Sequence, residues 1–167
     1  DSDCCIIGEM VSDIGKMNDI HNGIYIGGGT GIADGILLDG KIINLGNDKN
    51  PKKSWELRIP QGVNVESYLS PGGMLKNHNL KYKAKITSLK ELASSQYFEE
   101  TLSKAITAFD YLLKDRLKFF QRQKKEIEKI VIGQRLGQFL NEQPKSIKHL
   151  FQKDNIAPVE FSFQREI

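Results

Sequence analysis

The chain has 167 residues, of which 39% are hydrophobic and 27% are charged, so it can bury one folded core without disulfides. Its formal net charge of +3 is small, and the basic residues between 114 and 129 alternate with acidic ones, so nucleic-acid binding is not expected. No apolar run approaches the length of a membrane span, and the two cysteines are the neighbours Cys4 and Cys5. We therefore expect reduced thiols, a cytoplasmic protein and no membrane partner.

The first expected element is a helix over residues 1–18. Its apolar residues recur at helical spacing, and Asp1, Ser2 and Asp3 supply side chains that can cap a helix N-terminus. The chain starts at Asp1 without a methionine, which suggests a fragment or a trimmed domain.

Residues 23–44 are the most informative stretch. Three apolar runs are separated by a glycine cluster at residues 27–31 and by the pair Asp39-Gly40, and Asp-Gly between apolar runs is a strong hairpin signal. We predict three antiparallel strands. The glycines leave backbone amides bare of side chains, so the first turn either cradles a phosphate, with the Thr30 hydroxyl as a further donor, or is a turn without a ligand.

The rest of the chain alternates between helical and strand patterns. The clearest is an apolar stripe at helical spacing, which predicts a long helix over residues 97–122 whose stripe is core or a subunit interface. The other expected elements are a strand at 54–59, helical segments at 63–77 (interrupted at 70–73) and 80–92, a strand at 127–132, a helix at 136–151 that breaks near residue 143, and a strand at 156–163. A meander followed by alternating helices and strands is typical of an α/β layer with a mixed sheet.

Four segments in this order resemble the C-terminal lobe of the ROK family of sugar kinases and repressors, which has the actin-like ATPase fold. They are residues 1–9 (DSDCCIIGE), 28–36 (GGTGIADGI), 64–70 (NVESYLS) and 130–133 (IVIG). The resemblance covers nearly the whole chain and implies a ribonuclease H-like/actin-like ATPase lobe, with a mixed sheet, a three-strand antiparallel meander and flanking helices. It also implies that residues 1–167 are a single lobe without its N-terminal partner lobe, and it leaves a homodimer open.

The resemblance assigns catalytic and phosphate-binding roles to individual residues. Asp1 takes the place of the catalytic base, although an aspartate there is also an ordinary helix cap. Gly29, Thr30 and Gly31 take the place of the phosphate turn, and Gly133 that of the turn near the adenosine. The implied cofactors are ATP and Mg²⁺.

Two glutamates take the places of residues that contact sugar hydroxyls in the family. They are Glu66 and Glu56, and each can equally be an ordinary surface residue. Family members usually carry an E-x-G-H segment followed by a cysteine-rich zinc loop. Here Arg58 stands for the glycine, Ile59 for the histidine, and no cysteine follows, so we predict no zinc.

Three further positions depart from the family pattern. Ala33, Asp34 and Gln134 replace glycines. The Asp34 carboxylate can repel phosphate from the neighbouring turn or help to hold Mg²⁺.

Several conspicuous side chains are expected to have structural roles. Trp55 is expected to pack in the core rather than to serve as a platform for a sugar ring. Both cysteines are expected to lie on an apolar helix face. The three histidines, His21, His78 and His149, are scattered and are expected at the surface rather than on a metal.

These features predict an ATP-dependent sugar kinase of the glucokinase or hexokinase type, acting on a hexose or an amino sugar in carbohydrate metabolism. The alternative is a catalytically degenerate ROK-like protein that binds sugar as a sensor or regulator. A third reading is a glycine-rich α/β domain that binds no nucleotide. The isolated lobe is predicted to be inactive.

Overall fold

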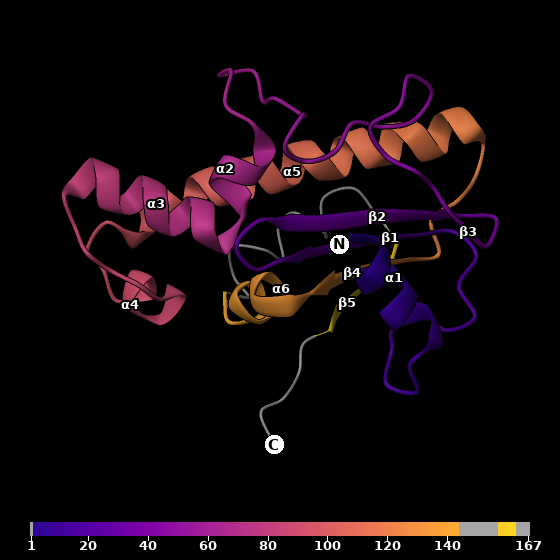
Figure 1. Cartoon of the computed structure of the whole chain (residues 1–167), viewed down its shortest axis with the longest axis horizontal. Coiled ribbons are helices and arrows are strands. Elements are labelled where there is room, and N and C mark those ends of the chain that lie inside the picture. The colour runs from indigo at the N-terminus through magenta and orange to yellow at the C-terminus, as the bar shows by residue number, and fades with distance from the viewer. Residues whose placement is uncertain (1, 144–156, 163–167) are drawn as a thin grey trace.

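The computed structural model describes residues 2–143 and 157–162. In chain order the elements are α1 (Ser2–Val11), β1 (Gly23–Gly28), β2 (Ile32–Leu38), β3 (Lys41–Ile42), α2 (Val65–Leu69), α3 (Pro71–Tyr82), α4 (Leu89–Ala93), α5 (Phe98–Gln123), β4 (Lys129–Gly133), α6 (Gln134–Asn141) and β5 (Val159–Ser162). The strands form a five-stranded sheet in the order β3-β2-β1-β4-β5 (Figure 1).

The sheet is mixed, as the sequence predicted. β1, β2 and β3 form the antiparallel meander, with Leu37 opposite both Gly23 and Ile42. β4 lies parallel to β1, and β5 lies parallel to β4. Asp39 and Gly40 make the tight turn between β2 and β3 with φ of 50° and 76°, the left-handed backbone that such a hairpin needs. The meander and the α/β fold class are therefore confirmed.

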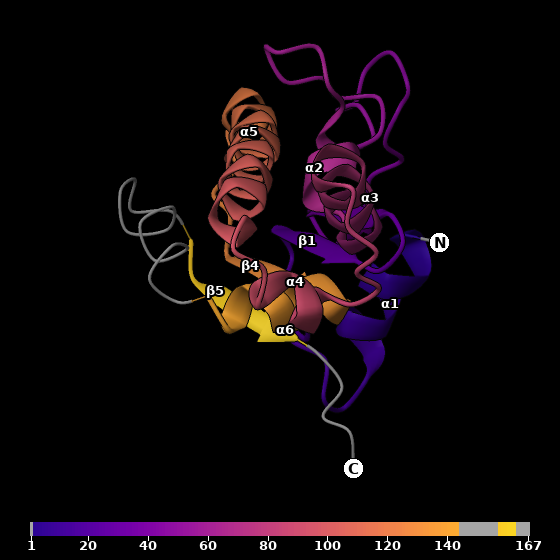
Figure 2. The same cartoon turned by 90° about the vertical axis from the view of Figure 1, so that its left-hand side faces the viewer.

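Helices cover both faces of the sheet. α2 and α5 lie over one face, and α1 lies against the other (Figures 1 and 2). Because neighbouring strand residues point to opposite faces, Ile24 and Ile26 of β1 pack into the large core beneath α5. Tyr25 between them packs into a smaller core with Ile6 of α1.

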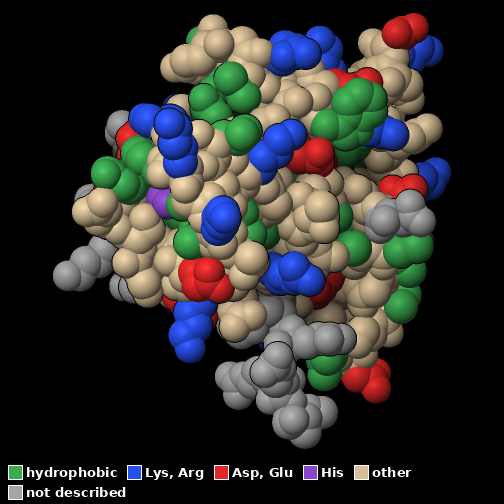
Figure 3. Space-filling model, turned by 60° about the vertical axis from the view of Figure 1, so that its left-hand side comes forward, with side chains coloured by type: hydrophobic (Ala, Val, Ile, Leu, Met, Phe, Trp, Pro, Cys, Tyr) green, Lys and Arg blue, Asp and Glu red, His purple; other side chains and the backbone are tan. Residues whose placement is uncertain are grey.

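α5 supplies one wall of the large core and runs for 26 residues. The apolar stripe predicted over residues 97–122 is buried in this core, which confirms its core interpretation. No helix in the described ranges is both long enough and apolar enough to cross a membrane. On the face shown in Figure 3, lysine and arginine side chains are dispersed among acidic ones.

The first helix is shorter than predicted, because α1 ends at Val11 instead of near residue 18. The chain turns back against the end of α1, where Met17 N–H donates to the Glu9 carbonyl at 3.0 Å. Gly15 makes this return possible, since a Cβ at Gly15 would lie 2.3 Å from the same carbonyl oxygen.

Other boundaries also differ from the predictions. Residues 54–59 form no strand. Residues 54–56 make a turn, because the N–H groups of Glu56 and Leu57 both donate to the Lys53 carbonyl, at 2.9 and 3.0 Å, and Arg58 makes an isolated bridge with Asn64. The interruption predicted at 70–73 narrows to Ser70, which ends α2 and caps α3 by accepting a hydrogen bond from Gly73 N–H. Residues 80–92 contain the end of α3 and the start of α4. The parts of the last predicted helix and strand at residues 144–151, 156 and 163 lie outside the described residues.

Candidate functional site

A groove of about 730 Å³ opens at the end of the sheet where β1 turns into β2. Four separate parts of the chain line it: the start of α1, the glycine turn, the segment after β3, and the first residue of α6. The lining residues are 2–5, 29–34, 44–45, 53–55 and Gln134. The groove therefore brings together two of the four segments that carry the family resemblance, residues 1–9 and 28–36, and Gln134 directly follows a third.

The glycine turn is held in place by three hydrogen bonds. Gly29 N–H donates to the Gly31 carbonyl at 3.0 Å, and the Gly29 carbonyl accepts from Gly72 N–H of α3 at 3.3 Å. Ile32 N–H donates to Oε2 of Glu66 at 2.9 Å. Helices α2 and α3 therefore fix the conformation of the turn from behind.

Three donors of the turn are left over for a ligand. Within the described residues, the N–H groups of Thr30 and Gly31 and the Thr30 hydroxyl make no hydrogen bond, and both residues line the groove. The groove is also bordered by the N-terminal residues of α1 and α6, Ser2 and Gln134. Free amides beside helix N-termini attract anions, because both carry partial positive charge.

Close packing explains one glycine outside the turn. A Cβ at Gly72 would lie 2.5 Å from the carbonyl oxygen of Thr30, so α3 can approach the turn only with glycine at this position.

Gly133 ends β4 next to Gln134, which lines the groove, and it provides space for a tyrosine. A Cβ at Gly133 or at its partner Gly27 would lie 2.5 Å from the Tyr25 hydroxyl. Burial raises the pKa of Tyr25 far above its ordinary value, and Cys5 and Glu9 raise it further, so this phenol stays protonated. The adenosine role of Gly133 stays a prediction.

Gln134 has a left-handed backbone conformation, which a glycine would adopt more easily. Its φ of 58° lies in the left-handed region, which costs a residue with a Cβ about 1–2 kcal/mol. Its side-chain amide donates to Sγ of Cys5 at 3.0 Å, which links α6 to α1 along the groove.

The two glutamates predicted to bind sugar already accept backbone hydrogen bonds. Oε2 of Glu66 accepts from Ile32 N–H, and Oε2 of Glu56 accepts from Lys53 N–H at 3.0 Å. Neither glutamate lines the groove. Glu56 follows Trp55 in the chain, and Glu66 is bonded to Ile32, and both of these partners do line it. Their sugar contacts therefore stay predictions. The predicted base, Asp1, lies outside the described residues, and its neighbour Ser2 lines the groove.

Asp34 has neither of the roles that the sequence suggested. Oδ2 accepts from Nε and Nη2 of Arg116, at 3.1 and 2.5 Å, and the two side chains are 4% and 0% exposed. Arg116 also donates to Asp115 Oδ2 at 2.5 Å and to the Lys52 carbonyl at 2.8 Å. The guanidinium neutralises Asp34, so the carboxylate neither repels phosphate nor is available to Mg²⁺.

The structure adds groove residues that sequence reasoning missed. Lys53 and Asn44 line the groove, as does Trp55, whose side chain is 54% exposed instead of buried in the core. Cys4 is also exposed rather than packed. A basic and polar loop occurs in most proteins, and only the fold shows that this one faces the glycine turn.

The segment that replaces the family's zinc loop is compact. Ile59 is 3% exposed in the core, and its N–H donates to the Val63 carbonyl at 2.9 Å. Arg58 Nη1 donates to the Gly62 carbonyl at 2.8 Å. In the described ranges, no group of three or more His, Cys, Asp or Glu side chains is arranged to hold a metal.

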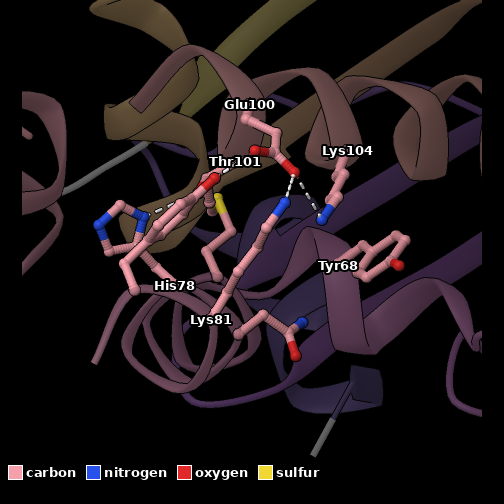
Figure 4. Close-up of a pocket in the computed structure, with 9 residues that line it drawn as sticks. Tyr68, His78, Lys81, Glu100, Thr101 and Lys104 are labelled. Carbon is pink, nitrogen blue, oxygen red and sulfur yellow. Dashed lines mark hydrogen bonds and ion pairs between the residues drawn. The ribbon is translucent and has the colours of Figure 1, made fainter. Parts of the chain in front are cut away.

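A second, small cavity of about 20 Å³ lies between α3 and α5, away from the glycine turn (Figure 4). Its wall includes His78, which is 2% exposed and not at the surface as predicted. The two ring nitrogens bond Thr101 Oγ1 at 2.9 Å and Ser95 Oγ at 3.0 Å. These bonds join α3 to α5 and to the connection between α4 and α5, and they explain the burial of the imidazole.

An ion cluster at this cavity gives a testable pH dependence. Glu100 accepts hydrogen bonds from Lys81, Tyr82 and Lys104 (Figure 4). The bond from Lys81, followed by those from Tyr82 and Lys104, lowers the pKa of Glu100 from 4.5 to about 2. Because the folded-state pKa is the lower one, the cluster stabilises the fold fully above the unfolded pKa and loses that effect as pH falls toward 2.

We expect a carboxyl NMR titration to place the Glu100 midpoint near 2. Lys81→Met should raise it, and an unchanged midpoint would contradict the assignment.

Comparison with known proteins shows the class of fold. No family model and no curated protein match the sequence. Among solved structures, the chain is similar to a ROK family protein from Streptococcus pneumoniae in complex with sucrose, with a TM-score of 0.67 and 15% identity over 98% of this chain. It is also similar to the Lmo2764 protein, a candidate N-acetylmannosamine kinase from Listeria monocytogenes (TM-score 0.72, 16% identity, 96% of this chain). A ROK family transcriptional regulator gives a TM-score of 0.53 at 15% identity over 89% of this chain.

The chain covers 58%, 58% and 43% of these three structures, so it spans less than two thirds of their length. The likenesses confirm that the chain has the actin-like ATPase fold that ROK proteins share. They therefore confirm, at the level of fold, the resemblance that the four segments indicated.

Proposed function

We propose that this chain is the phosphate-binding lobe of a ROK-like sugar kinase. The whole enzyme would transfer the γ-phosphoryl group of Mg-ATP to a hydroxyl of a hexose or an amino sugar. The observation that carries this proposal is the set of three free donors on Thr30 and Gly31, which face a groove bordered by two helix N-termini. Phosphoryl transfer depends on positioning and charge stabilisation, and these donors supply both for the transferred phosphate.

Further residues complete the proposed site. Asp1 is the proposed base for the attacking hydroxyl. Lys53 is the one cationic side chain among the described residues that line the groove, and it offers a phosphate contact. Mg²⁺ usually binds through one or two carboxylates together with substrate phosphates. Asp3 lines the groove and fits that need, whereas Asp34 is already paired. When bound, the ion would neutralise phosphate charge.

A sugar-binding regulator without turnover is the second candidate. It is favoured by Ile59, which is packed in the core where the family motif has a histidine, and by the similarity in fold to a ROK transcriptional regulator. In either case we expect the isolated 167 residues to show no turnover, because residues from a second lobe would be missing from the site. Robust phosphorylation by the isolated chain would contradict this expectation.

Thermal melting of the longest available form of the protein, with Mg-ATP and a panel of sugars, tests the two candidates. A ligand at a hundredfold excess over its dissociation constant stabilises the fold by about 2.7 kcal/mol. We expect shifts with both Mg-ATP and one sugar, followed by sugar phosphate formation. A shift with sugar alone would select the regulator. Mg-ATP binding that is unaffected by Gly29→Ala would show that the phosphates do not bind at the glycine turn.

A further inference from the structure

Trp55 is the one tryptophan of the chain, and its side chain is exposed to solvent at the groove. Its side chain is 54% exposed. An indole is a large apolar surface, so leaving it in water forgoes much of the stabilisation that burial would bring. An exposed indole that lines a groove offers an aromatic face to a ligand bound there.

The exposure is set by a well-anchored turn rather than by a loose loop. The Lys53 carbonyl accepts from Glu56 and Leu57 N–H, and the Glu56 carboxylate accepts from Lys53 N–H. Ser54 and Leu57, which lie on either side of Trp55 in the chain, are 1% and 8% exposed. Because the turn is anchored on both sides, its backbone presents Trp55 to the groove, which lowers the cost of ordering on binding.

The side chains that share the groove with Trp55 suit a sugar. Asn44, Ser2 and Asp3 bring an amide, a hydroxyl and a carboxylate to the same lining. A pyranose has a C–H face that is apolar and flat enough to stack on an aromatic ring, and an edge of hydroxyls that needs donors and acceptors.

We propose that the indole of Trp55 stacks on the C–H face of the pyranose ring that accepts the phosphoryl group. The polar side chains of the groove then take the ring hydroxyls. This inference rests on the proposed function, and it assigns to Trp55 the platform role that the sequence alone did not favour. The substrate that this stacking implies is a hexose or hexosamine in its ring form.

The test uses the full-length protein with Trp55→Ala and Trp55→Phe. Calorimetric titration measures the affinity for each sugar and, separately, for Mg-ATP. We expect Trp55→Ala to lose at least about tenfold in sugar affinity, as a lost aromatic contact implies, while Mg-ATP affinity stays within about twofold. Trp55→Phe should keep most of the sugar affinity. The difference in fluorescence between the wild type and Trp55→Phe, which isolates Trp55, should change when sugar saturates the protein.

Tyr97→Ala is the matched control, because Tyr97 is 42% exposed and does not line the groove. It should leave sugar affinity unchanged. Sugar binding that is equal in Trp55→Ala and wild type would overturn the stacking inference while leaving the kinase proposal in place. A loss of Mg-ATP affinity instead would show that the indole stacks on adenine. Binding of no sugar by the wild type would overturn both proposals.

Discussion

Replacing Arg116 with methionine is expected to lower the free energy of unfolding by about 3–5 kcal/mol. Arg116 is 0% exposed and pairs with Asp34, which is 4% exposed, so the substitution leaves a buried carboxylate without its partner. The Lys52 carbonyl also loses its hydrogen bond from Arg116, at 2.8 Å in the structure. Urea unfolding followed by circular dichroism measures the loss.

A double-mutant cycle separates the ion pair from the size of the side chain. Asp34→Ala alone should also destabilise the fold, because the guanidinium then keeps only Asp115 and the Lys52 carbonyl. Removing both charges with Asp34→Ala and Arg116→Met should cost less than the sum of the single changes. Lys125→Met is the control, since Lys125 and its partner Asp39 are 41% and 54% exposed, and it should cost no more than about 1 kcal/mol. Equal losses for Arg116→Met and Lys125→Met would show that the buried pair contributes little.

The fold and the glycine turn could be predicted from the sequence because their signals are local. The Asp39-Gly40 turn, the apolar strands around it and the stripe of the long helix lie within short windows, and periodicity reports them directly. The groove residues of the turn were predicted for the same reason. The need for glycine at position 72 follows from the fold, because a side chain there would meet Thr30. The pair Gly72-Gly73 in the sequence does not reveal this contact.

The remaining parts of the site depend on contacts between residues far apart in the chain. Asp34 and Arg116 are 82 residues apart, and an arginine on a charged helix is ordinarily on its solvated face. His78 is buried because Thr101 and Ser95 satisfy both ring nitrogens. Trp55 is exposed because its neighbours, rather than the indole, anchor the turn. Composition and spacing carry no information about such partners.

Gly29→Ala is expected to separate ligand binding from stability at the glycine turn. A Cβ at Gly29 would meet no atom within 4 Å, and Gly29 lines the groove. The free energy of unfolding should therefore change by no more than about 0.5 kcal/mol. Under the proposed function, the new methyl group would stand where phosphate oxygens approach the free amides of Thr30 and Gly31. Lost hydrogen bonds to a charged group imply at least about a tenfold fall in Mg-ATP affinity.

Gly72→Ala supplies the contrast, because its Cβ would lie 2.5 Å from the Thr30 carbonyl oxygen. Backbone on both sides must then shift, which should cost about 1–3 kcal/mol of stability as well as Mg-ATP affinity. Urea unfolding and calorimetric titration of both variants distinguish the two roles of the turn. If Gly29→Ala binds Mg-ATP as tightly as the wild type, the phosphates do not lie against these amides. If only Gly72→Ala weakens binding, the turn matters as a support for the groove and not as its phosphate cradle.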